Sequence, residues 1–281
     1  MSRPDVAAWR PSASPAEPDL YRGLAAFSAA VAILTALWAV SGEARTVGGV
    51  SVWLKPMKFA LSFAVLFGTI ALVRDRLSPA VRDGWPLRLV GWGMAAAMLA
   101  ETGWIVRQAA RGTGSHFNLS TPFEAFMYTA VMAAGAVYLV AAVGVVGWIA
   151  GRDRAAAMGD GLREGVRLGF LASFALTLVV AGYMSSGSGP HVGPHPAGAP
   201  VLPLLGWSGV TGDLRPAHFL ALHAMQALPL LGLWLDRRTD GRGRADAVRT
   251  VRAATLAWAA LTLAAFAQAL AGLPLLPLGS G

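Results

Sequence analysis

Seven long apolar segments are the feature that most limits what this chain can fold into. About 20 such residues span the hydrocarbon core of a bilayer as an α-helix. The segments are residues 20–40, 56–73, 87–106, 123–149, 168–184, 216–235 and 253–271. The composition agrees, because 55% of the 281 residues are hydrophobic and only 14% are charged. The sequence therefore predicts an all-α integral membrane bundle of seven transmembrane helices.

The remaining chain divides around these segments. Residues 1–19 are polar, contain four prolines and show no periodicity, so we expect a disordered cytoplasmic tail. The seven-helix transmembrane domain then covers residues 20–272, with a long outer loop at 185–215. A signal peptide is the alternative for the first segment. Its apolar region and its leader are too long for a typical one, so we expect an uncleaved anchor.

The basic residues predict how the chain is oriented. Of the 23 lysines and arginines, 17 fall in the tail and in the connections after the second, fourth and sixth segments. The positive-inside rule then places the N-terminus in the cytoplasm and the C-terminus outside. All five histidines fall on the outer side. Because the arginines lie in short loops, we interpret the net charge of +8 as a topology signal and exclude nucleic-acid binding. The expected partner is the lipid bilayer.

The absence of cysteine narrows the chemistry. The chain can form no disulfide, no thiolate metal site, no Fe–S cluster and no covalent haem of the usual kind. A metal site would have to use histidine, carboxylate, methionine or tyrosine. A transition metal or haem b is compatible with that set.

The sixth segment carries the most unusual polar residues. Pro216 suits the first turn of a helix, and Asp213 is placed to accept from the free amides of that turn. His223 and Gln226 then share one helix face, whereas His218 lies about 140° from His223. Polar groups inside a membrane-spanning helix are either functional or join neighbouring helices by hydrogen bonds.

The third segment carries an acid, Glu101, at a depth in the membrane similar to that of His223. Glu101 and Gln108 are seven residues apart and lie on one helix face, with Arg111 just beyond. Glu101 is a candidate catalytic residue. The structural alternative is an ion pair with Lys58, Arg107 or His223.

Both lysines of the chain lie at the start of the second segment. Lys55 and Lys58 can anchor the helix at the lipid head groups. Alternatively, Lys58 points into the bundle as a counter-charge. The connection after the third segment contains His116 and Asn118. It ends in a helix start in which Thr121 caps and Glu124 completes a capping box.

The loop at 185–215 contains two further histidines. His191 and His195 are four residues apart, but the prolines at 190, 194 and 196 prevent the helix that would align them. A loop this long is a functional lid or disordered. A metal clip formed by the two histidines is the alternative.

A resemblance to a known family rests on three motifs, which are WLKPMKF, RGTGSHFN and GWSGVTGDLRPAHFLALHAMQALP. With them the chain resembles a widespread uncharacterised family of bacterial multi-pass membrane proteins, which implies a location in the cytoplasmic (inner) membrane. The resemblance implies no mechanism. It implies a recurring polar set without His195, namely Lys58, Glu101, His116, Asn118, His191, Asp213, His218, His223 and Gln226.

These residues support three hypotheses of function. The first is a metal- or haem-binding redox protein, such as a membrane oxidoreductase, with an outward-facing site. Its ligands would be His116, His191, His218 and His223, with Glu101 and His223 as catalytic groups. Its supporting or substrate-binding residues would be Lys58, Gln108, Arg111, Asn118, Asp213 and Gln226. The second is a transporter, channel or receptor for a small polar or anionic solute that uses the same cluster. In the third, the polar residues only join helices.

Overall fold

The computed structural model describes residues 19–47, 49–187, 189–196, 198–203, 205–238 and 244–278. Residues 1–18 of the predicted tail lie outside these ranges. Within them, seven helices are long and apolar enough to cross a membrane, which confirms the predicted class. Large apolar side chains such as Leu34, Leu72 and Leu256 are exposed on these helices. Such surface is compatible with contact to lipid chains.

The chain divides into two compact units. The first contains residues up to 142 together with 152–158, and the second contains 143–151 and everything from 159 onward. The first holds α1 (Leu20–Val40), β1 (Thr46–Val47), β2 (Val50–Ser51), α2 (Leu54–Arg74), α3 (Pro79–Arg82), α4 (Trp85–Ala110), α5 (Pro122–Phe126) and the π-helical turn η1 (Met127–Met132). The boundary falls inside α6 (Ala133–Arg152). The second holds α7 (Asp160–Ser186), β3 (His191–Val192), β4 (Gly212–Asp213), α8 (Arg215–Arg238) and α9 (Arg244–Leu270).

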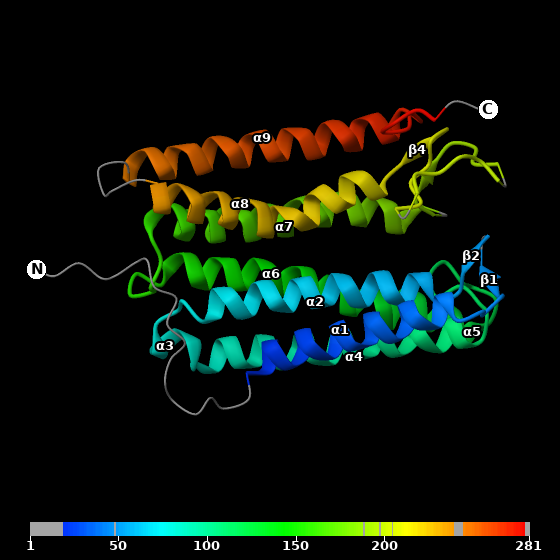
Figure 1. The fold of residues 1–281 in the computed structure, drawn as a ribbon, viewed down its shortest axis with the longest axis horizontal. Coiled ribbons are helices and arrows are strands. Elements are labelled where there is room, and N and C mark those ends of the chain that lie inside the picture. Colours follow the sequence, from blue (N-terminus) through cyan, green and yellow to red (C-terminus); the bar gives the residue numbers. More distant parts are fainter. Residues whose placement is uncertain are drawn as a thin grey trace, which may run out of the picture. The chain divides into compact units, whose positions relative to one another are not determined.

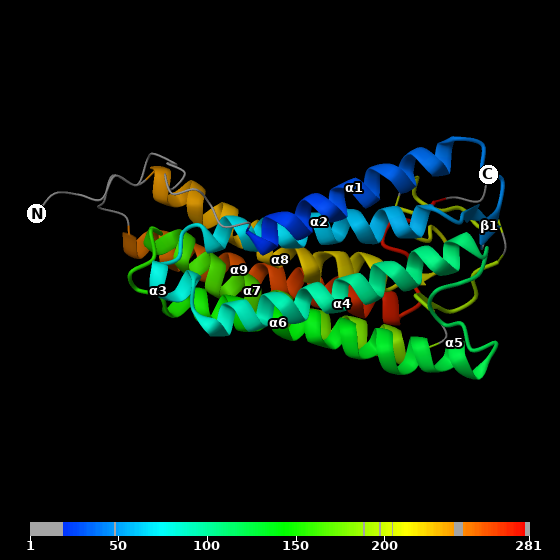
Figure 2. The ribbon, with the colours of Figure 1, turned by 90° about the horizontal axis from the view of Figure 1, so that it is seen from below.

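In the first unit, α1 packs along α2, and α2 packs against α4 (Figures 1 and 2). The Tyr21 hydroxyl donates to the carbonyl of Leu87 at 3.0 Å and so joins α1 to α4. Gly91 makes room for this ring, because a Cβ there would lie 2.9 Å from the Tyr21 oxygen. At the other end of α4, the strands β1 and β2 form a short antiparallel pair.

The fourth predicted segment is not one regular helix. Thr121 caps its start by accepting from the Glu124 amide at 3.2 Å, as the sequence predicts. After the short α5, residues 127–132 wind as a π-helix before α6 begins. Inserted π-helical turns of this kind are frequent at functional sites. Here the turn faces α4, which carries Glu101.

In the second unit, α7 and α8 cross on a stripe of glycines. Gly161, Gly165 and Gly169 are spaced four apart on α7. A Cβ on Gly165 would lie 2.5 Å from the carbonyl oxygen of Leu228, so only glycine permits this approach. Small residues at this spacing let membrane helices pack backbone to backbone. The helix α9 packs on both α7 and α8.

Two helix starts lie earlier than predicted. α7 begins at Asp160 rather than residue 168, and α9 begins at Arg244 rather than 253. The apolar pattern omits these first turns because they are charged. The start of α7 is stabilised by Asp236 of α8, whose carboxylate accepts from the amides of Gly161 at 2.9 Å and Leu162 at 2.7 Å.

Candidate functional site

Polar residues gather in each unit separately. The first unit contains what we name the Glu101 cluster, formed by Lys55, Phe59, Glu101, His116 and Tyr128. The second unit contains what we name the Asp213 cluster, formed by His191, His195, Ser208, Asp213 and Arg215. A third group, His218, His223 and Gln226, lies along α8.

Glu101 lies deep in α4 and is only 4% exposed. Within the described residues its Oε2 atom has no hydrogen-bond partner. On the facing helix, Gly135 leaves space beside the carboxylate, since a Cβ there would lie 3.5 Å from Oε1. Lys55 is close enough for its charge to act on Glu101. The acid is therefore buried and only partly satisfied, with a cation nearby.

Aromatic rings connect Lys55 to His116. The Lys55 ammonium lies 5.9 Å from the centre of the Phe59 ring, a cation–π distance. The Phe59 ring in turn lies 5.4 Å from the His116 ring, and the Tyr128 ring lies 5.7 Å from it on η1. The Glu101 cluster thus combines an acid, a cation, an imidazole and a phenol.

The connection between α4 and α5 holds His116 in place. The Trp104 indole donates to the carbonyl of Ser115 at 2.9 Å, and the Ser115 hydroxyl lies 3.1 Å from His116 Nδ1. The next residue, Phe117, has a φ of 56°, which is strained for a bulky side chain. Asn118 supports the turn by donating to the carbonyl of Gly114 at 3.1 Å. Backbone strain of this kind is often retained at functional sites.

The His116 imidazole is kept neutral by its surroundings. Burial disfavours the charged ring, and the nearby Lys55 charge adds to this effect. Together they lower the pKa of His116 from its ordinary 6.5 to about 3. At physiological pH this ring therefore offers one donor and one acceptor and carries no charge.

An ion pair fastens the same connection to the end of α4. Arg111 Nη1 donates to Glu124 Oε1 at 2.6 Å and to Gln108 Oε1 at 2.9 Å. Glu124, at 3% exposure, also accepts from the Ser120 hydroxyl. Sequence reasoning assigned Glu124 only to a capping box. That assignment was incomplete, because the carboxylate also binds Arg111 across thirteen residues.

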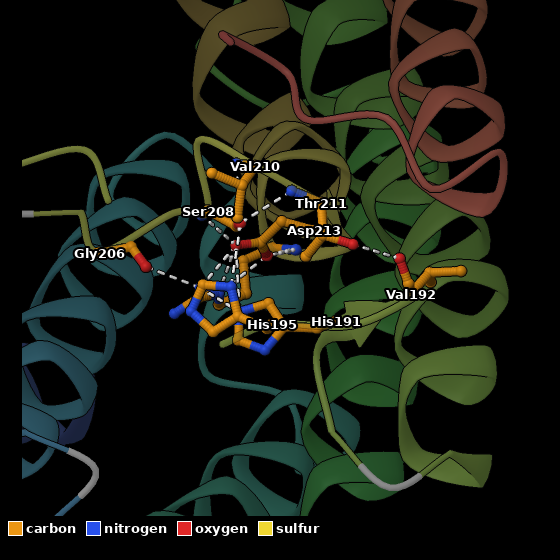
Figure 3. Close-up of polar contacts among 9 residues, drawn as sticks. His191, Val192, His195, Gly206, Ser208, Val210, Thr211 and Asp213 are labelled. Carbon is orange, nitrogen blue, oxygen red and sulfur yellow. Dashed lines mark hydrogen bonds and ion pairs between the residues drawn. The ribbon is translucent and has the colours of Figure 1, made fainter. Parts of the chain in front are cut away.

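The Asp213 cluster forms where β3 pairs with β4 (Figure 3). Asp213 is 3% exposed and accepts from the Ser208 amide at 2.8 Å, the Arg215 amide at 3.0 Å and Arg215 Nε at 2.8 Å. Burial alone would raise the pKa of Asp213, but these bonds and the Arg215 charge outweigh it and lower the pKa. The predicted cap at the start of α8 is confirmed.

His191 and His195 stack on each other within this cluster. Their ring centroids are 4.0 Å apart with an interplanar angle of 15°. His191 Nε2 lies 3.2 Å from Arg215 Nη2, and His195 Nδ1 lies 3.2 Å from the Ser208 hydroxyl. The sequence predicted that prolines would prevent their alignment. That reasoning excluded a helix correctly but missed the β3–β4 pairing, which includes His191, and the contact of His195 with Ser208.

On α8, His223 and Gln226 share a face as predicted, with His223 Nδ1 3.2 Å from Gln226 Oε1. The Phe219 ring lies 4.2 Å from the His223 ring. His218 Nδ1 is buried and has no hydrogen-bond partner within the described part of the chain. Lys58, for which lipid anchoring and an inward counter-charge were the alternatives, is partly buried near the start of α2.

The described residues contain no group of three or more histidine, aspartate or glutamate side chains that could hold a metal ion. His116 belongs to the first unit, whereas His191, His218 and His223 belong to the second. Binding of one metal or haem by these four histidines stays a prediction.

Sequence reasoning gave no role to four residues of the two clusters, Phe59, Tyr128, Ser208 and Arg215, and it assigned Lys55 to lipid anchoring. It considered His195 only as half of a metal clip with His191, outside the recurring polar set. Only the position of Arg215, two residues after Asp213, could have indicated its contact. Comparison with family models, curated proteins and solved structures finds no match.

Proposed function

We propose that the protein is a proton-coupled transporter for a small anionic solute, with the Glu101 cluster as its solute site. One observation carries the proposal: Glu101 is buried in a membrane-spanning helix with Oε2 unbonded in the described structure and with Lys55 nearby. An ionisable residue inside a membrane span is costly, and such residues usually mark ion or substrate pathways.

The alternatives fit this observation less well. A carboxylate that only joins helices is expected to use both oxygens in hydrogen bonds, because each unsatisfied buried acceptor costs about 1–3 kcal/mol. A metal centre needs several ligands around one point, and the described residues contain no such group. A solute or a proton that arrives during transport would supply the missing partner of Glu101.

Charge balance suggests how the site works. Lys55 and Glu101 together are neutral when both are ionised. When an anion binds Lys55, the site gains one negative charge, and a buried net charge is unfavourable. Protonation of Glu101 restores neutrality, so one proton accompanies each monovalent anion. The neutral His116 ring and the Tyr128 hydroxyl can donate hydrogen bonds to the anion without adding charge.

The proposed orientation gives the coupling a direction. With the N-terminus in the cytoplasm, the end of α4 that carries the 111–121 connection faces outside. The Glu101 cluster would then load from the external side of a bacterial cytoplasmic membrane, where the proton gradient drives uptake. This orientation rests on the distribution of basic residues.

The test is flux into proteoliposomes that contain a trapped pH dye. Nitrate, phosphate and methanesulfonate serve as probe anions under an inside-alkaline pH gradient. We expect at least one of them to acidify the wild-type liposomes. Glu101→Gln should reduce this proton entry at least tenfold and keep exchange of the labelled anion, because the variant retains Lys55. Lys55→Gln should reduce both.

Thr102→Val is the matched control. It alters the neighbouring residue on α4, whose hydroxyl contacts Met98 and not Glu101, so both fluxes should persist. Two results would refute the proposal. One is wild-type proton entry in Glu101→Gln liposomes. The other is proton entry that does not depend on any of the three anions.

A further inference from the structure

The Asp213 cluster has a hydrogen-bond pattern that fixes the protonation state of both its histidines. Arginine only donates hydrogen bonds. Arg215 Nη2 lies 3.2 Å from His191 Nε2, so this nitrogen accepts and carries no proton. The proton of the neutral His191 ring is then on Nδ1.

Ser208 determines which nitrogen of the His195 ring carries the proton. The Ser208 hydroxyl oxygen accepts from the amides of Val210 at 3.2 Å and Thr211 at 3.1 Å, which uses both of its lone pairs. Its own hydrogen must therefore point to His195 Nδ1, 3.2 Å away. His195 Nδ1 accepts, and its ring proton is on Nε2. The two stacked rings are neutral and hold opposite tautomers.

A proton on either ring opposes this arrangement. Protonated His191 would point an N–H at the Arg215 guanidinium and add a like charge beside it. Protonated His195 would point an N–H at the Ser208 hydroxyl hydrogen. If both rings were charged, two cations would stack 4.0 Å apart. In each case a hydrogen bond is lost, and protonation of His191 also brings like charges together.

One negatively charged group, the Asp213 carboxylate, faces the two histidines, and it already accepts other hydrogen bonds. Asp213 Oδ2 lies 3.8 Å from His191 Nε2, but this carboxylate already binds Arg215 and the Ser208 amide. The neighbouring stretches 198–210 and 261–272 contain no ionisable side chain. The remaining charged group at the cluster is Arg215, which repels a protonated His191.

We propose that the Asp213 cluster is a proton-binding site whose protonation opens the connection between α7 and α8. Opening would separate β3 from β4, break the 2.9 Å bond from the Leu214 amide to the Pro190 carbonyl and free Arg215 at the start of α8. A hollow of about 600 Å³, lined by Pro194, Pro196 and Thr211 among others, borders the cluster and would change shape. This proposal does not depend on the Glu101 cluster carrying a solute.

The surroundings of His191 set the pH range in which the connection between α7 and α8 opens. Burial lowers the pKa of His191, Asp213 opposes this effect, and His195 and Arg215 add to the lowering. The ring therefore stays neutral at pH 7.5, and acid below its ordinary pKa of 6.5 is needed to open the connection.

Hydrogen exchange measured by mass spectrometry tests this proposal on the full chain in nanodiscs. Exchange is compared at pH 7.5 and pH 5, after correction for the intrinsic effect of pH on exchange. We expect peptides covering 205–214 to exchange about tenfold faster at pH 5, while the paired strands 46–47 and 50–51, which contain no histidine, stay unchanged. Equal corrected rates at both pH values would overturn the proposal.

Two substitutions reproduce the accepting atoms without the charge. His191→Gln places an amide oxygen near the position of Nε2, and His195→Asn places one near Nδ1. The double variant should remain protected at both pH values. His223→Asn removes a histidine outside the cluster and should keep the wild-type response. A double variant that still opens in acid, or a His223→Asn variant that no longer does, would contradict the proposal.

A second measurement does not depend on how the variants fold. Nitrogen NMR of histidine-labelled wild-type protein at pH 7.5 should show His191 protonated on Nδ1 and His195 on Nε2. The His191 ring should become cationic over the pH range in which exchange accelerates. Identical tautomers, or titration outside that range, would overturn the assignment.

Discussion

Replacing Gly165 by alanine should weaken the contact between α7 and α8. The added Cβ would lie 2.5 Å from the Leu228 carbonyl oxygen and 2.9 Å from the Pro229 Cα. These are backbone atoms, so α8 must move by about 0.9 Å to restore an ordinary contact of 3.4 Å. Overpacking of this kind costs about 1–3 kcal/mol. Alanine recovers about 0.8–1.0 kcal/mol through its higher helix propensity. We expect a net loss of about 0–2 kcal/mol.

Gly182 provides the matched control on the same helix. A Cβ there would meet no atom within 4 Å. Gly182→Ala should therefore stabilise the protein by up to about 1 kcal/mol through helix propensity alone. The two variants differ by one methyl group each, and their free energies of unfolding are compared in mixed detergent and SDS micelles. If Gly165→Ala were as stable as Gly182→Ala, the close glycine crossing would be wrong.

Three further predictions concern the polar contacts, and one concerns metals. Arg111→Gln should lower the free energy of unfolding because Glu124 loses a charged hydrogen bond, and adding Glu124→Gln should recover part of the loss in a double-mutant cycle. Asp236→Ala should cost about 0.5–2 kcal/mol because α7 loses its cap, whereas Asp236→Asn should retain part of the stability in the same unfolding assay. Since the pKa of His116 falls from 6.5 unfolded to about 3 folded, the unfolded chain binds the proton more readily, so stability should decrease as pH falls from 6.5 towards 3. His116→Gln should flatten that part of the pH profile. Treatment with a chelator should leave thermal unfolding unchanged, since no group of metal ligands occurs among the described residues.

Sequence reasoning succeeded where the signal is local. The seven apolar segments predict the seven helices, because a bilayer demands about 20 apolar residues for each crossing. Asp213 and Pro216 mark the start of α8, and Thr121 marks the start of α5, since capping depends on residues only a few positions apart. The shared face of His223 and Gln226 follows from helix geometry alone.

Contacts between distant parts of the chain could not be predicted in this way. Lys55 precedes Glu101 by 46 residues, and nothing in either segment specifies that α2 brings the two together. His191 pairs with Asp213 about twenty positions further along, and His195 contacts Ser208, neither of which the local sequence specifies. The glycine stripe on α7 is visible in the sequence, but the sequence does not indicate which helix packs against it.

Glu101 differs from the other buried acids of the described chain. Asp153 accepts from the amides of Ser78 at 2.7 Å and Ala155 at 3.2 Å, and the other three make ion pairs. Glu124 lies 2.6 Å from Arg111, Asp213 lies 2.5 Å from Arg215, and Glu164 lies 2.7 Å from both Arg167 and Arg252. Each of these carboxylates offsets its desolvation with a direct ion pair.

Glu101 is equally buried but makes no such ion pair among the described residues, and Lys55 acts on it only through its charge. If packing alone had selected this position, an apolar side chain would stabilise α4 better, because it carries no desolvation cost. A buried acid that lacks a permanent ion-pair partner is suited to the reversible binding of a cation. A proton meets that requirement, and the exchange of that proton is what the Glu101→Gln experiment measures.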